Sequence, residues 1–150
     1  MKRLLTIAAI AALLIGCTAQ QPAPVVEDNT PGFVLSDENV EVKIGEDGAL
    51  LSLINKETGH NYASGEGLWR MFYNTHQEKE MQIDGTENTP AVSQEGDVIT
   101  IAYKDLVHRG KALKMDLTLT VKVDDGAVRF GSVVSNNEPG TIIRELQYPL

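Results

Sequence analysis

The chain has few of the residues that build metal or disulfide sites. Its 150 residues include one cysteine, Cys17, and three histidines. A single thiol excludes an intramolecular disulfide and any zinc site with more than one thiolate. His60, His76 and His108 are not spaced as ligand pairs. We therefore expect solvated loop histidines, no metal site and no cofactor.

Basic residues are also scarce. Lys and Arg number 13 against 21 Asp and Glu, which gives a net charge of −8. Nucleic acids and anionic lipid surfaces repel such a protein, so neither is an expected partner. Catalytic signatures are absent as well: there is no Gly-x-Ser-x-Gly motif and no phosphate loop, and Gly65-Glu66-Gly67 lacks the third glycine of a nucleotide fingerprint. We expect no catalytic residues in the chain itself.

The amino terminus resembles an export signal. Two cations precede an apolar run from Leu4 to Ile15. As a helix this run would span about 18 Å, short of the roughly 30 Å core of a bilayer, so it predicts a signal peptide rather than a membrane span. Leu14-Ile15-Gly16-Cys17 resembles the lipobox of bacterial lipoproteins. That resemblance implies cleavage before Cys17 and acylation of its sulfur; an ordinary secretory signal cleaved near Ala19 is the alternative.

Residues 1–16 are thus the predicted lipoprotein signal peptide, and residues 17–32 the predicted flexible tether. The tether contains three prolines, Pro22, Pro24 and Pro31, which stiffen a solvated chain. The two acyl chains of a diacylglycerol on Cys17 suffice for stable anchoring. The expected location is the bacterial cell envelope, with the membrane as a partner through this anchor. The choice of leaflet stays open.

Period two dominates the chain after the tether. Val40, Val42 and Ile44 alternate with polar residues, which predicts a strand with one buried face. The clearest signal covers residues 112–123, where apolar residues occupy every second position without a break. On a helix these residues would surround the whole circumference. Further strands are predicted at 49–55, 68–73, 99–103, 128–134 and 141–148, with a short one near 81–83 in an otherwise long loop, 74–97.

Glycine-containing turns separate these segments, and none shows convincing helical periodicity. Turns are predicted at residues 46–48, 56–59, 108–111 and 124–126. Short strands joined by such turns indicate an all-β, antiparallel β-sandwich over residues 33–150. The last run, 142–148, is apolar and strand-like up to the end of the chain, and such an edge needs another strand or cover. We therefore expect a sandwich truncated at its C-terminal end, with partner strands elsewhere.

Residues 40–70 resemble the opening of the galactose-mutarotase-like β-sandwich found at the amino end of many bacterial glycoside hydrolases. The matching parts, after the first alternating strand, are Asp47-Gly48-Ala49-Leu50, Ser52-Leu53, Asn55-Lys56, Thr58-Gly59, Tyr62 and Leu68-Trp69-Arg70. Residues 130–136 and 145–149 resemble middle strands of that domain. The resemblance implies a partial supersandwich whose complete form is larger than this chain.

In such glycosidases the sandwich packs against a following (α/β)-barrel that carries the catalytic carboxylates. The resemblance therefore implies a non-catalytic, carbohydrate-associated N-terminal module of a lipid-anchored glycoside hydrolase, with the barrel missing from this chain. It does not imply sugar epimerisation, because the histidine base and the glutamate of that chemistry have no match here. A stand-alone glycan-binding lipoprotein and a purely structural envelope lipoprotein remain the alternatives.

Aromatic residues make up only 5% of the chain, and their main cluster surrounds Trp69. Aromatic rings stack on sugars and a guanidinium hydrogen-bonds hydroxyls, so Trp69, Arg70 and Tyr73 are the candidate carbohydrate contacts. At period two, however, Trp69 and Tyr73 share one face with Met71, while Arg70 lies on the other. Large aromatics are more often sandwich core, so core is the favoured interpretation and a sugar platform the alternative.

Overall fold

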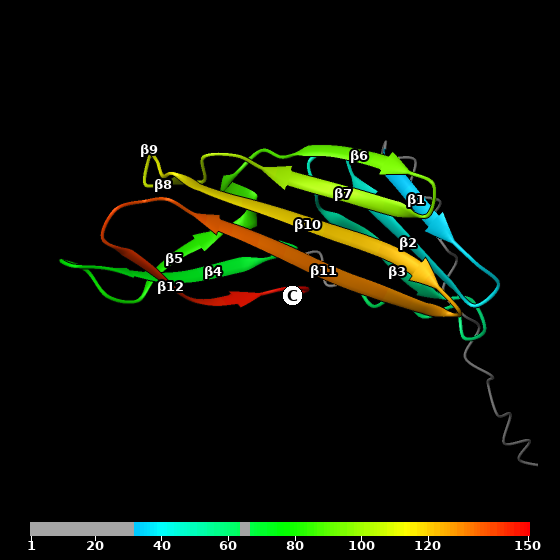
Figure 1. The fold of residues 1–150 in the computed structure, drawn as a ribbon. Helices are drawn as coiled ribbons and strands as arrows, with labels where there is room; N and C mark the ends of the chain where they lie inside the picture. Colours follow the sequence, from blue (N-terminus) through cyan, green and yellow to red (C-terminus); the bar gives the residue numbers. More distant parts are fainter. Residues whose placement is uncertain (1–31, 64–66) are drawn as a thin grey trace, which may run out of the picture.

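The computed structural model describes residues 32–63 and 67–150, which form an all-β structure (Figure 1). Twelve strands and one short 3-10 helix, η1 (Gly85–Glu87), make up the regular structure of these residues. Each pair of hydrogen-bonded strands in the described residues is antiparallel. The predicted signal peptide, Cys17 and residues 17–31 of the predicted tether lie outside the described residues.

The strands form three sheets and one small hairpin. The first sheet has the order β1 (Gly32–Ser36), β2 (Val40–Gly45), β3 (Leu50–Asn55). The largest has the order β11 (Ala127–Asn136), β10 (Met115–Asp124), β7 (Val98–Tyr103), β6 (Ala91–Glu95). The third has the order β12 (Thr141–Gln147), β4 (Arg70–Thr75), β5 (Met81–Asp84). The hairpin pairs β8 (Val107–His108) with β9 (Lys111–Ala112).

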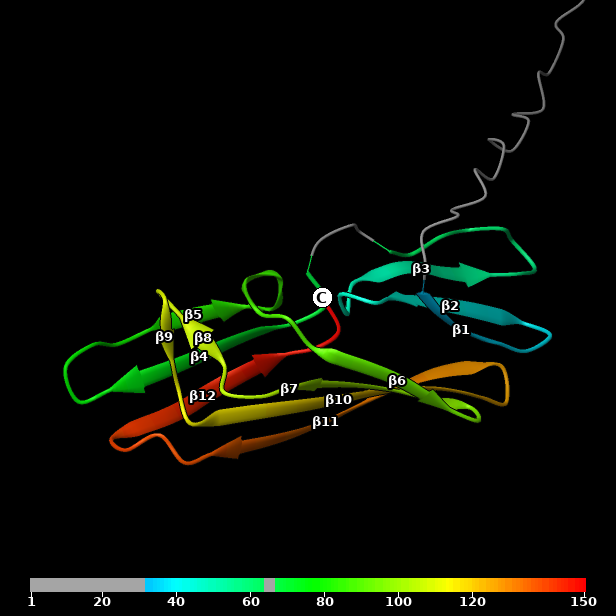
Figure 2. The same ribbon diagram turned by 90° about the horizontal axis from the view of Figure 1, so that it is seen from above.

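These sheets are stacked in two layers (Figure 2). The four-stranded sheet forms one layer, and the two three-stranded sheets lie end to end in the other. Strand β1 contacts β7 and β10, and β2 contacts β10 and β11. The predicted all-β class and its antiparallel sandwich character are therefore confirmed.

The core lies between the two layers and follows the predicted alternation. On β10, Met115, Leu117, Leu119 and Val121 are fully buried, and the residues between them are half-buried. The opposing layer contributes fully buried side chains from β2, β4 and β5 and from the segment before β4: Val42, Ile44, Trp69, Met71 and Ile83. Burying one such side chain contributes about 1.5–3 kcal/mol, so this row of contacts is the main attraction between the layers.

Two-residue turns close two of the hairpins as predicted. Asp125 and Gly126 join β10 to β11 with φ of 51° and 74°, and Arg109 and Gly110 join β8 to β9 with φ of 52° and 76°. Positive φ at both central residues is the type I′ geometry, whose twist matches that of the flanking strands. The Arg109-Gly110 turn also fixes the position of a charged side chain at one end of the sandwich.

The observed strands differ from the predicted ones in several places, and the short β8 and β9 had no predicted counterpart. β6 occupies part of the segment predicted as a loop. Four of its five residues are exposed and only Val92 is half-buried, so its sequence lacks the alternation of apolar and polar residues that predicts a strand. β1 had no predicted counterpart and begins at Gly32, one residue before the expected start of the domain. β4 runs from Arg70 to Thr75 rather than from residue 68 to 73; Leu68 and Trp69 precede it and are buried.

Asp37 joins the two layers at one end of the sandwich. Its Oδ1 accepts hydrogen bonds from the backbone N–H groups of Asn39 and Val40, at 2.8 and 2.9 Å, within the β1–β2 turn. Its Oδ2 accepts one from the N–H of Gly126 in the β10–β11 turn, at 2.8 Å. These backbone hydrogen bonds, the one from Val40 foremost, hold the pKa of the Asp37 carboxyl below its usual range.

We expect Asp37→Asn to lower the melting temperature at neutral pH, because the new amide group cannot accept bonds on both sides. The pKa of Asp37 is lowered in the folded state, so its stabilisation is complete above the unfolded pKa of about 3.8 and is lost as the pH falls further. The difference between wild type and variant should therefore shrink below that pH. Thermal denaturation followed by circular dichroism measures both effects. Asp125→Asn in the neighbouring turn is the control, and a pH-independent difference would contradict the assignment.

Candidate functional site

A cleft of about 490 Å³ opens at the end of the sandwich opposite the Asp37 contacts. The β4–β5 loop, the β8–β9 hairpin and the β11–β12 loop line it. These three connections lie at the same end of the molecule (Figure 1). Its volume is within the range of about 300–1,000 Å³ for small-ligand sites. Other hollows on the described surface measure about 360 to 510 Å³, so volume does not distinguish this cleft from them. Its side chains do.

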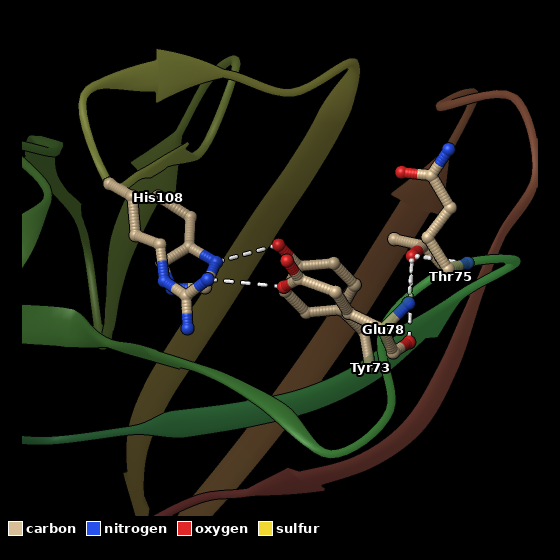
Figure 3. A network of polar contacts seen from close by, with 6 residues as sticks. Tyr73, Thr75, Glu78 and His108 are labelled. Carbon is tan, nitrogen blue, oxygen red and sulfur yellow. Dashed lines mark hydrogen bonds and ion pairs between the residues drawn. The ribbon is translucent and has the colours of Figure 1, made fainter.

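A buried tyrosine–histidine pair forms one wall of the cleft (Figure 3). The Tyr73 Oη and His108 Nδ1 atoms are 2.6 Å apart, and the two rings meet edge to face at 5.6 Å. Burial raises the pKa of the Tyr73 hydroxyl, so this group keeps its proton at neutral pH. The tautomer of His108 decides which of the two atoms donates the hydrogen bond. The pair fastens β8 to β4.

Two ion pairs connect the three segments around the cleft. Arg109 Nη1 lies 3.1 Å from Glu78 Oε2, and Lys111 Nζ lies 3.3 Å from Glu138 Oε1. The first joins the β8–β9 hairpin to the β4–β5 loop, and the second joins it to the β11–β12 loop. With two cations and two anions in these pairs, their charges cancel.

Local hydrogen bonds orient the two carboxylates. The Thr75 hydroxyl accepts a hydrogen bond from the backbone N–H of Glu78 at 2.9 Å and thereby holds the turn that carries Glu78 (Figure 3). Glu138 Oε2 accepts a hydrogen bond from the backbone N–H of Lys114 at 2.9 Å. That bond, with the nearby Lys111 ammonium, lowers the pKa of the Glu138 carboxyl. Both cleft carboxylates therefore have fixed partners.

The three predicted carbohydrate contacts do not form one exposed surface. Trp69 and Tyr73 point into the core with Met71, and their exposed fractions are 0% and 2%. Arg70 lies on the outer face of β4, where its Nε donates to Asp84 Oδ1 at 2.7 Å. The structure thus places both aromatics as the favoured core interpretation predicted. Of the three residues, Tyr73 alone borders the cleft.

The Trp69 ring is packed too closely for a sugar to reach it in this conformation. It meets the ring of Tyr103 edge to face at 5.1 Å. A Cβ atom on Gly85 would lie 2.7 Å from Trp69 Nε1, so only glycine leaves room for the indole there. The Nε1–H group is buried.

The prediction of solvated histidines is wrong for His108, whose exposed fraction is 8%. The sequence carried a weak signal for this: Leu106 and His108 are two positions apart, and both side chains are buried before the turn. The strand before the turn has only two residues, Val107 and His108, and is too short to show an alternation by itself. The cleft residues Glu78, Arg109, Lys111 and Glu138 were also missed, because nothing in the sequence shows that their loops converge.

Within residues 32–63 and 67–150, no group of three or more His, Cys, Asp or Glu side chains is arranged to hold a metal ion. The same residues contain no helix long and apolar enough to cross a bilayer. Cys17, the predicted lipidation site, lies outside this part of the chain.

We expect Tyr73→Phe to lower the free energy of unfolding by about 1–3 kcal/mol, because it leaves the buried His108 ring nitrogen without its partner. Chemical denaturation measures the change. Tyr62→Phe is the matched control, since the Tyr62 side chain is 60% exposed and its loss of a hydroxyl should have little effect. Equal stabilities of wild type and Tyr73→Phe would show that the Tyr73–His108 bond does not fasten β8 to β4.

The chain matches no protein-family model, no curated protein and no solved structure.

Proposed function

We propose that the chain is a non-catalytic, carbohydrate-associated β-sandwich module of a lipid-anchored envelope protein, and that it packs against the catalytic barrel of a glycoside hydrolase. The observation that carries this proposal is the open side of the sandwich, defined here as the side formed by β11 and β12. β11 is an edge of the four-stranded sheet, and β12 is an edge of a sheet in the other layer. Both run along the same side of the molecule (Figure 1).

Apolar side chains along the open side are only half-buried. They are Val128, Phe130 and Val134 of β11 and Ile143 and Leu146 of β12. Two large apolar side chains on the same strands are mostly exposed: Val133 at 70% and Ile142 at 65%. Native proteins usually protect edge strands with charges, proline or a cover, and β11 has ten residues with one charge and no proline. A packing partner on this side would complete the burial.

The electrostatics of the cleft support a module without its own hydrolytic chemistry. A glycosidase needs a carboxylic acid with a raised pKa that protonates the leaving oxygen. Glu138 has a lowered pKa, and Glu78 is engaged by Arg109. These carboxylates are suited to accept hydrogen bonds from a ligand or to hold the loops.

Photo-crosslinking tests the packing surface. We expect a photoreactive residue in place of Ile142 to crosslink, in the cell envelope, to a barrel of a glycoside hydrolase, which peptide mass spectrometry identifies. The same residue in place of Tyr62, at a similar exposure of 60%, should not reach that barrel. The packing proposal is refuted if position 142 yields no such crosslink or if both positions yield it equally.

A stand-alone glycan-binding lipoprotein is the second candidate. The cleft favours it, because hydrogen-bond donors and acceptors from three segments face one cavity. In this case the module would bind glycan directly through the sandwich rather than shape the cleft of a neighbouring enzyme. Photo-crosslinking separates the two candidates, since only the first requires a barrel at the open side.

The lipid anchor is proposed on the lipobox-like residues that end at Cys17. We expect radioactive palmitate to label the protein and the label to disappear in Cys17→Ala, because this is the chain's single thiol. The variant should also leave the membrane fraction, since without the diacylglycerol it lacks the two buried chains that stable anchoring needs. Unchanged labelling of Cys17→Ala would remove the anchor from the proposal.

A further inference from the structure

We infer that the cleft beside Tyr73 and His108 is a binding site for an uncharged polyhydroxylated ligand, such as a short neutral oligosaccharide. This inference rests on the carbohydrate-associated function proposed above and adds to it a place and a ligand class. The residues that carry it are Glu78, Arg109, Lys111 and Glu138, together with the buried pair behind them.

Donors and acceptors occur side by side in this cleft. Arg109 and Lys111 donate only, whereas the carboxylates of Glu78 and Glu138 accept only. A sugar hydroxyl does both, so neighbouring hydroxyls on one ring can accept from a cation and donate to the carboxylate beside it. Met81, Leu113 and Pro139 also line the cleft and supply apolar contact for the C–H groups of a sugar ring.

The charges explain why the ligand should be neutral. Each cation at the cleft is already paired with a carboxylate at 3.1 or 3.3 Å, so its charge is balanced and attracts an anionic ligand only weakly, while its remaining N–H groups can still donate to hydroxyls. The chain as a whole has a net charge of −8, which repels anions at longer range. A cationic ligand would have to compete with Arg109 and Lys111 for the same carboxylates. A neutral ligand meets none of these penalties.

The cleft is also held in shape before any ligand arrives. The Tyr73–His108 bond fastens the β8–β9 hairpin to β4, and the hairpin turn presents Arg109 with a φ of 52°. The hydrogen bond from the Lys114 N–H to Glu138 fixes the third segment. Fewer loops and side chains must then lose conformational freedom when the ligand binds, which favours affinity. In this scheme Tyr73 and His108 are positioning residues, and the four charged side chains contact the ligand.

Isothermal titration of the full chain in detergent tests the site with maltotetraose, xylotetraose and cellotetraose as neutral probes and trigalacturonate as the anionic one. We expect at least one neutral probe to bind and trigalacturonate not to bind. Arg109→Asn should weaken neutral binding at least tenfold while keeping the turn, because asparagine tolerates positive φ. Arg129→Asn is the matched control: its side chain is 65% exposed, against 67% for Arg109, and is also ion-paired, but it lies outside the cleft.

A second pair of variants tests the charge argument. Glu78→Gln frees Arg109 and should give measurable trigalacturonate binding, whereas Asp97→Asn makes the same change in net charge at the far end of β7 and should not.

Binding of a neutral probe that survives Arg109→Asn would overturn the cleft as the site but leave a glycan-binding module. Equal binding of trigalacturonate by the wild type would overturn the ligand class. Binding of none of the probes would overturn the inference, while crosslinking at position 142 tests the packing function separately.

Discussion

The inward-facing row of β10 is the constraint on which the rest of the structure depends. β10 lies between β7 and β11 in the four-stranded sheet and contacts β1 and β2 in the other layer. Its four apolar side chains, Met115, Leu117, Leu119 and Val121, are fully buried. A slip of one residue in its register would turn all four toward solvent and the threonines and charges between them inward. The long run of alternating residues therefore specifies one arrangement of both layers.

The cleft takes its geometry from this core. Tyr73 lies on β4, whose inward face is part of the core, and its hydroxyl reaches the cleft while its ring remains buried. His108 follows β7 after a short connection and is held against that hydroxyl. The charged residues of the cleft are then attached to turns that begin or end at core strands. Rigid strands with variable connections are a common basis for binding sites.

Much of the fold followed from local pattern, because alternation and turn chemistry act over a few residues. Strands β2, β7 and β10 and the turns at Gly48 and Gly126 were predictable in this way. β6 was not, since it is stabilised by pairing with β7 and has almost no buried face of its own. The pairing of β12 with β4 joins segments far apart in the sequence, and alternation says nothing about which strands become neighbours.

The candidate site was harder to predict than the fold for the same reason. Glu78, Arg109 and Glu138 belong to three separate connections, and only the assembled sandwich brings them to one cavity. The aromatic residues that looked most suited to a sugar were, as the alternation favoured, mainly core. The two ion pairs at the cleft were likewise not predictable, because each joins residues from different connections.

The placement of Trp69 has a practical consequence. It is the single tryptophan of the chain, and its indole lies between the layers with no exposure to water. Its fluorescence emission should therefore lie at short wavelength while the sandwich is closed and move to longer wavelength once water enters. One intrinsic chromophore thus reports optically, without any label, on whether the two layers are together.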